Sequence, residues 1–324
     1  MGWSPHQGNS RAGGIAGRCV RRARRTHPSN ARRLTCVSEF PALRNPVMIA
    51  AFEGWNDAGD AATAAVEQLG LTWDATPLTE LDPEGYYDFQ VSRPTVRLID
   101  GVTRTIDWPT TRLSACRLEG SPSDVILVHG IEPNFRWRAF CDELLKIAVD
   151  HQVARVVGLG ALLADVPHTR PIQVTGSAHD EETAAQMGLA RSRYEGPTGI
   201  SGVFQDACVQ AGIPSLSFWA SVPHYVSQAP SPKATLALLH RVEEILDIEV
   251  PLGNLPSQAD EWETEVSQIA AEDEEISEYI RALEEREEED EPLKPASGES
   301  IAAEFERYLR RRGPRPGEAG GRAR

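Results

Sequence analysis

The stretch Val47-Met48-Ile49-Ala50-Ala51-Phe52-Glu53-Gly54-Trp55-Asn56-Asp57 says most about the fold of this 324-residue chain. Its six apolar residues do not alternate with polar ones, which is typical of a strand covered on both faces. Two carboxylates, an amide and an indole follow at the carboxyl end of that strand. Because open α/β sheets bind ligands at this end of their strands, the loop is a candidate functional site.

The rest of the chain alternates strand-like and helix-like segments, as α/β proteins do. A helix is expected from Ala58 to a glycine stop at Gly70. Asp100-Gly101, between 95–99 and 102–108, is a strong type I′ hairpin signal, and the hairpin is expected to extend the sheet as an antiparallel appendage. Further strands are expected at 75–81, 124–129, 155–163, 172–176 and 215–222, and further helices at 137–148, from 180, at 200–211 and at 232–246.

Charge is distributed very unevenly along the chain. Residues 1–38 contain eight arginines and no acidic residue, and removing those eight positive charges from the net charge of −15 leaves −23 for the rest. An acidic body argues against binding to nucleic acid, whose phosphates need basic surfaces. The basic segment lacks the apolar stretch of a signal peptide and is expected to be a disordered extension.

The five cysteines are scattered and show no Cys-x-x-Cys pair or His/Cys metal spacing. This usage favours a reducing cytoplasm, without a bound metal or cofactor. No segment approaches the roughly 20 apolar residues of a membrane-spanning helix. His168 with Asp165 would supply only two weak metal ligands.

The region 253–312 is expected to be an acidic helical extension, followed by a disordered tail at 313–324. Asp273 interrupts its apolar stripe, so we expect it to dock on the domain or on a neighbouring subunit rather than form a long coiled coil. A solvated linker is expected at 284–291 and a last amphipathic helix at 301–309. The stripe consists of Trp262, Val266, Ile269, Ile276, Ile280 and Leu283.

Several motifs resemble the bacterial form of the proteasome-assembly-chaperone (PAC) family over about 46–252. The resemblance implies a three-layer αβα fold with a mostly parallel central sheet for 39–252, similar to nucleoside phosphorylases and hydrolases. It also implies a homo-oligomer, a trimer being one form, with protein partners such as proteasome core subunits. The motifs are Phe52-Glu53-Gly54-Trp55-Asn56-Asp57-Ala58-Gly59, Gly130-Ile131-Glu132-Pro133-Asn134, Leu159-Gly160-Ala161-Leu162-Leu163-Ala164-Asp165-Val166-Pro167-His168-Thr169-Arg170-Pro171 and Tyr194-Glu195-Gly196-Pro197-Thr198-Gly199.

Polar side chains gather in the loops after four expected strands, and a further loop precedes the helix at 200–211. Because parallel strands end at one edge of a sheet, a shared pocket is one interpretation. The candidate residues are Glu53, Trp55, Asn56, Asp57, His129, Glu132, Arg136, Asp165, His168, Arg170, Tyr194, Glu195 and His224.

The other interpretation gives these residues structural roles. Glu53 and Asp57 would cap the following helix, Arg136 and Arg170 would pair with loop acids, and His129 would be a satisfied histidine at the rim. The segment 194–199 is either a lid or a fixed turn. The aromatic pair Tyr86-Tyr87 belongs either to an interface or to the core.

Motifs of covalent catalysis and of phosphate binding are absent. The chain contains no Gly-x-Ser-x-Gly elbow and no Walker-type Gly-Lys-Ser/Thr. We therefore expect a cytoplasmic, non-catalytic assembly or interaction protein. The alternative is a nucleoside-hydrolase-like enzyme or small-molecule binder that uses Glu53, Asn56, Asp57, Glu132, Asp165 and His168.

Overall fold

The computed structural model describes residues 42–226 and 228–288. The basic extension at 1–38, the last amphipathic helix at 301–309 and the tail at 313–324 lie outside the described residues. Within the described ranges, no helix is long and apolar enough to cross a membrane.

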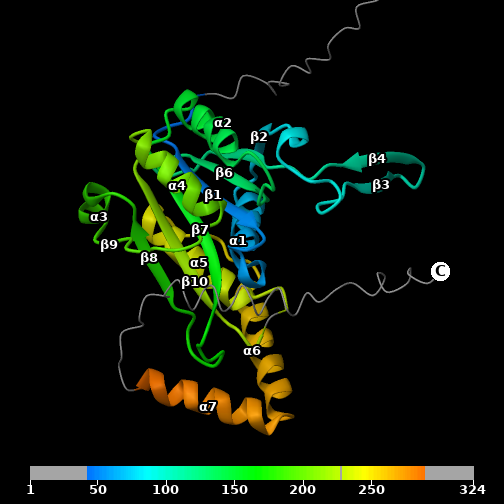
Figure 1. Ribbon diagram of the computed structural model, residues 1–324, viewed down its shortest axis with the longest axis vertical. Coiled ribbons are helices and arrows are strands. Elements are labelled where there is room, and N and C mark those ends of the chain that lie inside the picture. The colour runs from blue at the N-terminus through cyan, green and yellow to red at the C-terminus, as the bar shows by residue number, and fades with distance from the viewer. Residues whose placement is uncertain (1–41, 227, 289–324) are drawn as a thin grey trace, which may run out of the picture. The chain divides into compact units, whose positions relative to one another are not determined.

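An eight-stranded sheet forms the centre of the protein, in the order β2-β5-β6-β1-β7-β10-β8-β9 (Figure 1). The central strands β6, β1, β7 and β10 are parallel, whereas β5 and β8 run antiparallel to their inner neighbours. The strands are Val47–Glu53 (β1), Thr76–Glu80 (β2), Arg112–Cys116 (β5), Val125–Ile131 (β6), Arg155–Ala164 (β7), Val174–Ala178 (β8), Ala190–Arg191 (β9) and Ser215–Pro223 (β10).

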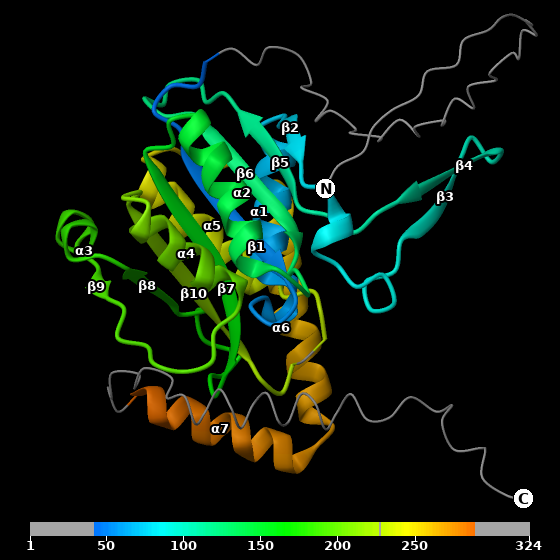
Figure 2. The ribbon, with the colours of Figure 1, turned by 45° about the horizontal axis from the view of Figure 1, so that its top comes forward.

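Two pairs of helices cover the two faces of this sheet (Figure 2). Ala61–Thr72 (α1) and Pro232–Leu246 (α5) pack on one face, and Trp137–Asp150 (α2) and Ile200–Gln210 (α4) pack on the other. A smaller helix, Glu181–Met187 (α3), begins at the predicted cap Asp180. The α/β architecture expected from the sequence is confirmed.

Side chains of β1 explain why the sheet is covered twice. Val47, Ile49 and Ala51 contribute to the core beneath α1 and α5, while Met48, Ala50 and Phe52 contribute to the core beneath α2 and α4. Successive side chains of a strand point to opposite faces, so a run of six apolar residues requires an apolar layer on each side.

The first helix differs from its predicted bounds at both ends. A short 3-10 turn, Ala58–Asp60, precedes α1, and α1 continues past Gly70 to Thr72. Gly70 is therefore not the stop. It lies within the helix, where a Cβ would be 3.6 Å from the Leu127 side chain of β6.

The expected hairpin is present, but its place is not the predicted one. Thr95–Ile99 (β3) and Thr103–Asp107 (β4) flank Asp100 and Gly101, whose φ angles of 52° and 71° are those of a type I′ turn. The two strands form a separate sheet instead of extending the large one. The antiparallel strand that extends the large sheet beyond β6 is β5, which sequence reasoning missed because its Arg112-Leu113-Ser114-Ala115-Cys116 has no β-branched residue.

The acidic extension consists of two helices, Leu255–Ala271 (α6) and Glu274–Glu288 (α7), separated at Asp273. Asp273 Oδ1 accepts hydrogen bonds from the backbone N–H groups of Glu275 and Ile276, so the residue that breaks the stripe begins the next helix. Ile269 does not follow the predicted stripe and is 67% exposed, because the buried face of α6 passes through Val266 and Ala270. The linker predicted at 284–291 is wrong over 284–288, which belong to α7.

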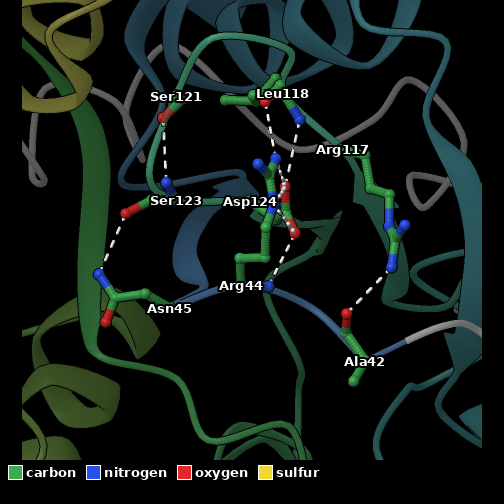
Figure 3. Close-up of polar contacts among 8 residues, drawn as sticks. All are labelled: Ala42, Arg44, Asn45, Arg117, Leu118, Ser121, Ser123 and Asp124. Atoms are coloured by element: carbon green, nitrogen blue, oxygen red, sulfur yellow. Dashed lines mark hydrogen bonds and ion pairs between the residues drawn. The ribbon is translucent and has the colours of Figure 1, made fainter.

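An ion pair between the exposed Arg44 and the buried Asp124 lies at the amino end of the sheet (Figure 3). Asp124, which is 0% exposed, lies 2.6 Å from the guanidinium of Arg44 and also accepts bonds from the backbone N–H groups of Arg44 and Leu118. Burial alone would raise the pKa of Asp124, but these hydrogen bonds together lower it. The ion pair thus ties the segment before β1 to the turn between β5 and β6.

Replacing Asp124 by Ala should lower the free energy of unfolding by about 1–3 kcal/mol, because the buried Leu118 N–H, the partly buried Arg44 N–H and the exposed Arg44 guanidinium lose their acceptor. Urea denaturation at pH 7 measures the loss. Glu119→Ala, an exposed residue of the same turn with the same charge change, is the control and should stay within about 0.5 kcal/mol of the wild type. Since the folded-state pKa of Asp124 is lowered, its contribution should disappear as the pH falls below about 4. Equal losses for the two variants would contradict this role.

Candidate functional site

The carboxyl ends of β6, β1, β7 and β10 lie at one edge of the sheet, because these strands are parallel. They do not end at the same level. The register places Glu53 at the end of β1 beside Ile131 of β6, whereas β7 and β10 pair as far as Ala164 and Pro223. The candidate residues accordingly form two groups, one after β1 and β6 and one after β7 and β10.

In the first group, Glu132 joins the loop after β1 to the beginning of α4. Its Oε1 accepts hydrogen bonds from Asn56 Nδ2 at 3.2 Å and from the backbone N–H of Ile200 at 2.8 Å. A carboxylate at a helix N-terminus satisfies an N–H group that has no partner within the helix. Burial raises the pKa of Glu132, and both hydrogen bonds oppose that shift.

Gly199 makes this arrangement possible. It precedes α4 and lies so close to Asn56 that a Cβ at this position would be 2.2 Å from Asn56 Nδ2. Asn56 is itself only 4% exposed, and its carbonyl accepts a hydrogen bond from the N–H of Ala161 in β7. The segment 194–199 therefore ends at a tightly packed point, which favours the fixed turn over the lid.

Asp57 caps helix α1, as the structural interpretation predicted. Its carboxylate accepts hydrogen bonds from the backbone N–H groups of Ala62, at 2.6 Å, and Thr63, at 3.2 Å, and from the Thr63 hydroxyl. Burial nevertheless raises the pKa of Asp57 to about 6, against the effect of these three bonds. The buried Asp57 carboxyl therefore has a pKa closer to neutral pH than an ordinary aspartate has.

Glu53 does not cap a helix and instead faces His129. Its Oε1 lies 3.5 Å from His129 Nε2, and Glu67 Oε1 of α1 lies 3.7 Å from Nδ1 of the same ring. His129 Nε2 is shielded from solvent and has no hydrogen-bond partner among the described residues, so the prediction of a satisfied histidine is wrong. A protonated imidazole here would be attracted by both carboxylates.

In the second group, His168 is a buried connector between two parts of the fold. Its backbone N–H and Nδ1 lie 2.7 and 2.8 Å from the Tyr225 hydroxyl, and its Nε2 lies 2.9 Å from the Ser267 hydroxyl of α6. Since Tyr225 accepts the bond from the N–H, its own proton is available for Nδ1, and the ring proton is assigned to Nε2. Burial lowers the pKa of His168, which agrees with a neutral ring.

The other residues of this group hold α6 and α7 on the same chain. Asp165 Oδ1 lies 3.2 Å from His224 Nδ1, and the His224 ring meets the Tyr279 ring of α7 edge to face at 5.4 Å. Thr169 donates a hydrogen bond to Glu284 of α7. The acidic helices are therefore docked on their own domain, one of the two arrangements expected from the sequence.

Lys233 strengthens this attachment. Its ammonium group, on the first turn of α5, pairs with Glu263 of α6 and donates to the His168 carbonyl at 2.6 Å. Sequence reasoning missed Lys233, Ser267 and Tyr279, since nothing in the spacing shows that residues so far along the chain meet the loop after β7.

Arg136 and Tyr194, two of the remaining candidates, contact different parts of the fold. Arg136 lies over the Tyr86 ring, with its Cζ 5.7 Å from the ring centroid. The exposed Tyr194 donates to the Pro197 carbonyl within its own loop, beside the exposed Glu195. Trp55 is 36% exposed and Arg170 is half-buried.

The Tyr86-Tyr87 pair belongs to the core and not to an exposed interface, because its side chains are 3% and 4% exposed. Tyr86 packs edge to face on Phe140, and Tyr87 donates to the Ile131 carbonyl. Among residues 42–226 and 228–288, no group of three or more His, Cys, Asp or Glu side chains could hold a metal ion. The exposed face of α6 carries a cluster of polar, mostly acidic residues, namely Asp260, Glu261, Thr264 and Glu265.

Comparison with known proteins gives consistent matches. The model of the PAC2 family matches residues 51–270. A PAC2 family protein from Streptomyces avermitilis is 56% identical, with a TM-score of 0.69, over 72% of this chain and 99% of that chain. A proteasome-assembly chaperone homologue from Mycobacterium tuberculosis is 60% identical over the same shares, with a TM-score of 0.66.

More distant matches show the fold alone. An archaeal proteasome activator from Pyrococcus furiosus is 16% identical, with a TM-score of 0.57, over 71% of this chain and 96% of that chain. No curated protein matches the chain.

The buried cap predicts an unusual pH dependence. Because the folded-state pKa of Asp57 is raised to about 6, the folded protein holds a proton that the unfolded chain has already released above about pH 4. Stability of the wild type relative to Asp57→Asn should therefore fall by roughly 2 kcal/mol between pH 4 and pH 7. Urea denaturation across this range measures it, with Asp150→Asn, exposed at the end of α2, as the control. A difference that stays constant or grows with pH would contradict the shift.

Proposed function

This chain belongs to the PAC2 family, and from that premise we propose that it is a non-catalytic assembly protein that binds subunits of the proteasome core before they assemble. The main support is the 60% identity to a protein described as a proteasome-assembly chaperone homologue, which the chain matches over 99% of its length.

The contacts at the carboxyl edge also support a role in binding rather than catalysis. Asp57 uses its carboxylate to begin α1, and Glu132 uses one oxygen to bind both Asn56 and the beginning of α4. His168 has both ring nitrogens engaged by Tyr225 and Ser267. A general acid or base must reach its substrate, and these groups already hold the fold together. The nucleoside-hydrolase-like alternative therefore has less support.

The proposal includes self-association and a cytoplasmic location. The described cysteines Cys116, Cys141 and Cys208 are buried free thiols, and burial raises the pKa of each to about 12. Such thiols stay protonated and unreactive, as suits a reducing compartment. A homo-oligomer, with a trimer as one form, would present several copies of the same binding surface to a ring of subunits.

Capture of proteasome subunits tests this function. The tagged full chain should retain purified, unassembled proteasome α-subunits from the same organism, and the two should co-elute as one complex in size-exclusion chromatography with native mass spectrometry. Preassembled core particle is the control, because an assembly factor should bind free subunits in preference to the finished particle. No complex with α-subunits, alone or mixed with β-subunits, would overturn the proposal and leave the family and fold unaffected.

A further inference from the structure

The β3-β4 hairpin has an apolar face without a covering layer in the described chain. Paired residues of an antiparallel ribbon share a face, and the register pairs Val96 with Ile106 and Leu98 with Arg104. Val96, Leu98 and Ile106 are 47%, 59% and 53% exposed. One face of the ribbon is therefore an apolar patch with a single arginine at its end.

A two-stranded ribbon of this kind is marginally stable without packing against another layer. All five residues of β3 are exposed, and the two strands form a sheet of their own. The opposite face carries the ion pair of Arg97 with Asp107 and is mostly polar, with Ile99 as its one apolar residue within the two strands. An exposed apolar patch bordered by polar residues marks a binding surface, so the face of Val96, Leu98, Ile106 and Arg104 is the one that needs a partner.

A surface of complementary character lies on α6 of the same chain. Asp260, Glu261, Thr264 and Glu265 form an exposed acidic face, and Ile269 follows Glu265 one helical turn later. Residues four apart lie on the same side of a helix, so Glu265 and the exposed Ile269 belong to one surface strip. This face offers carboxylates for an arginine and an isoleucine side chain for an apolar surface.

We propose that the apolar face of the β3-β4 hairpin docks on the exposed acidic face of α6 in a second copy of this chain. The charges of the two candidate surfaces favour α6, and not a second hairpin, as the surface that the hairpin contacts. Two hairpins packed face to face would bring the two copies of Arg104 onto the same apolar patch, where like charges are costly. Arg104 against Asp260, Glu261 and Glu265 is attractive. The contact is heterologous, joining two different surfaces, and repeats of it close into a ring when the rotation permits.

This inference rests on the self-association included in the proposed function and names the surfaces that produce it. Sedimentation equilibrium of the full chain, without any proteasome subunit, should show an oligomer. Arg104→Glu and Glu265→Arg should each weaken association by about tenfold or more, the scale of losing one close charge pair. The double variant Arg104→Glu with Glu265→Arg should recover most of the loss. Arg138→Glu, an equal charge change at an exposed position of α2, should have no effect.

A photo-crosslinker at position 98 locates the contact directly. With mixed ¹⁵N-labelled and unlabelled protein, crosslinks between copies should map to 260–272. A monomeric wild type, crosslinks from hairpin to hairpin, or single variants that associate like the wild type would each overturn the inference. If the Arg104→Glu variant no longer associates but still captures proteasome subunits, the proposed binding function does not depend on this contact. If the wild type forms the predicted oligomer but captures no subunit, the contact is supported and the proposed binding function is not.

Discussion

The fold depends on satisfying the buried polar groups where parallel strands end and helices begin. A helix starts with N–H groups that have no partner inside it, and in this protein two of those starts lie against the carboxyl edge of the sheet. Asp57 fills that need for α1 and Glu132 fills it for α4, with Asn56 linking the two loops. Both carboxyls have pKa values raised by burial, so the acceptors are held where water cannot replace them.

Beyond β7 and β10 the same edge serves a different purpose. His168, buried between Tyr225 and Ser267, and Lys233, paired with Glu263, attach the acidic helices to the domain. Both helices also bury apolar side chains, such as Val266 of α6 and Leu283 of α7, and these polar contacts add to that packing. An arrangement built this way presents acidic helix surface on a rigid support, which suits a protein that acts by binding other proteins.

Local pattern predicted local structure well. The apolar run of β1, the Asp100-Gly101 turn and the proline at the start of α5 each determine their element within a few residues. What could not be predicted depends on contacts between distant positions. Arg44 meets Asp124 across 80 residues, and His168 meets Ser267 across 99. The sequence brought the candidate residues to one edge, but the greater length of β7 and β10, which divides them into two groups, follows only from the pairing register.

Hydrogen-exchange mass spectrometry of Glu132 variants tests most directly whether this edge is structural. In Glu132→Ala the amides at the beginning of α4 and in the loop at 54–57 should exchange faster than in the wild type, because Ile200 and Asn56 lose their shared acceptor. Glu132→Gln keeps an acceptor oxygen and should exchange much more like the wild type. Unchanged exchange at both segments in Glu132→Ala would contradict the account.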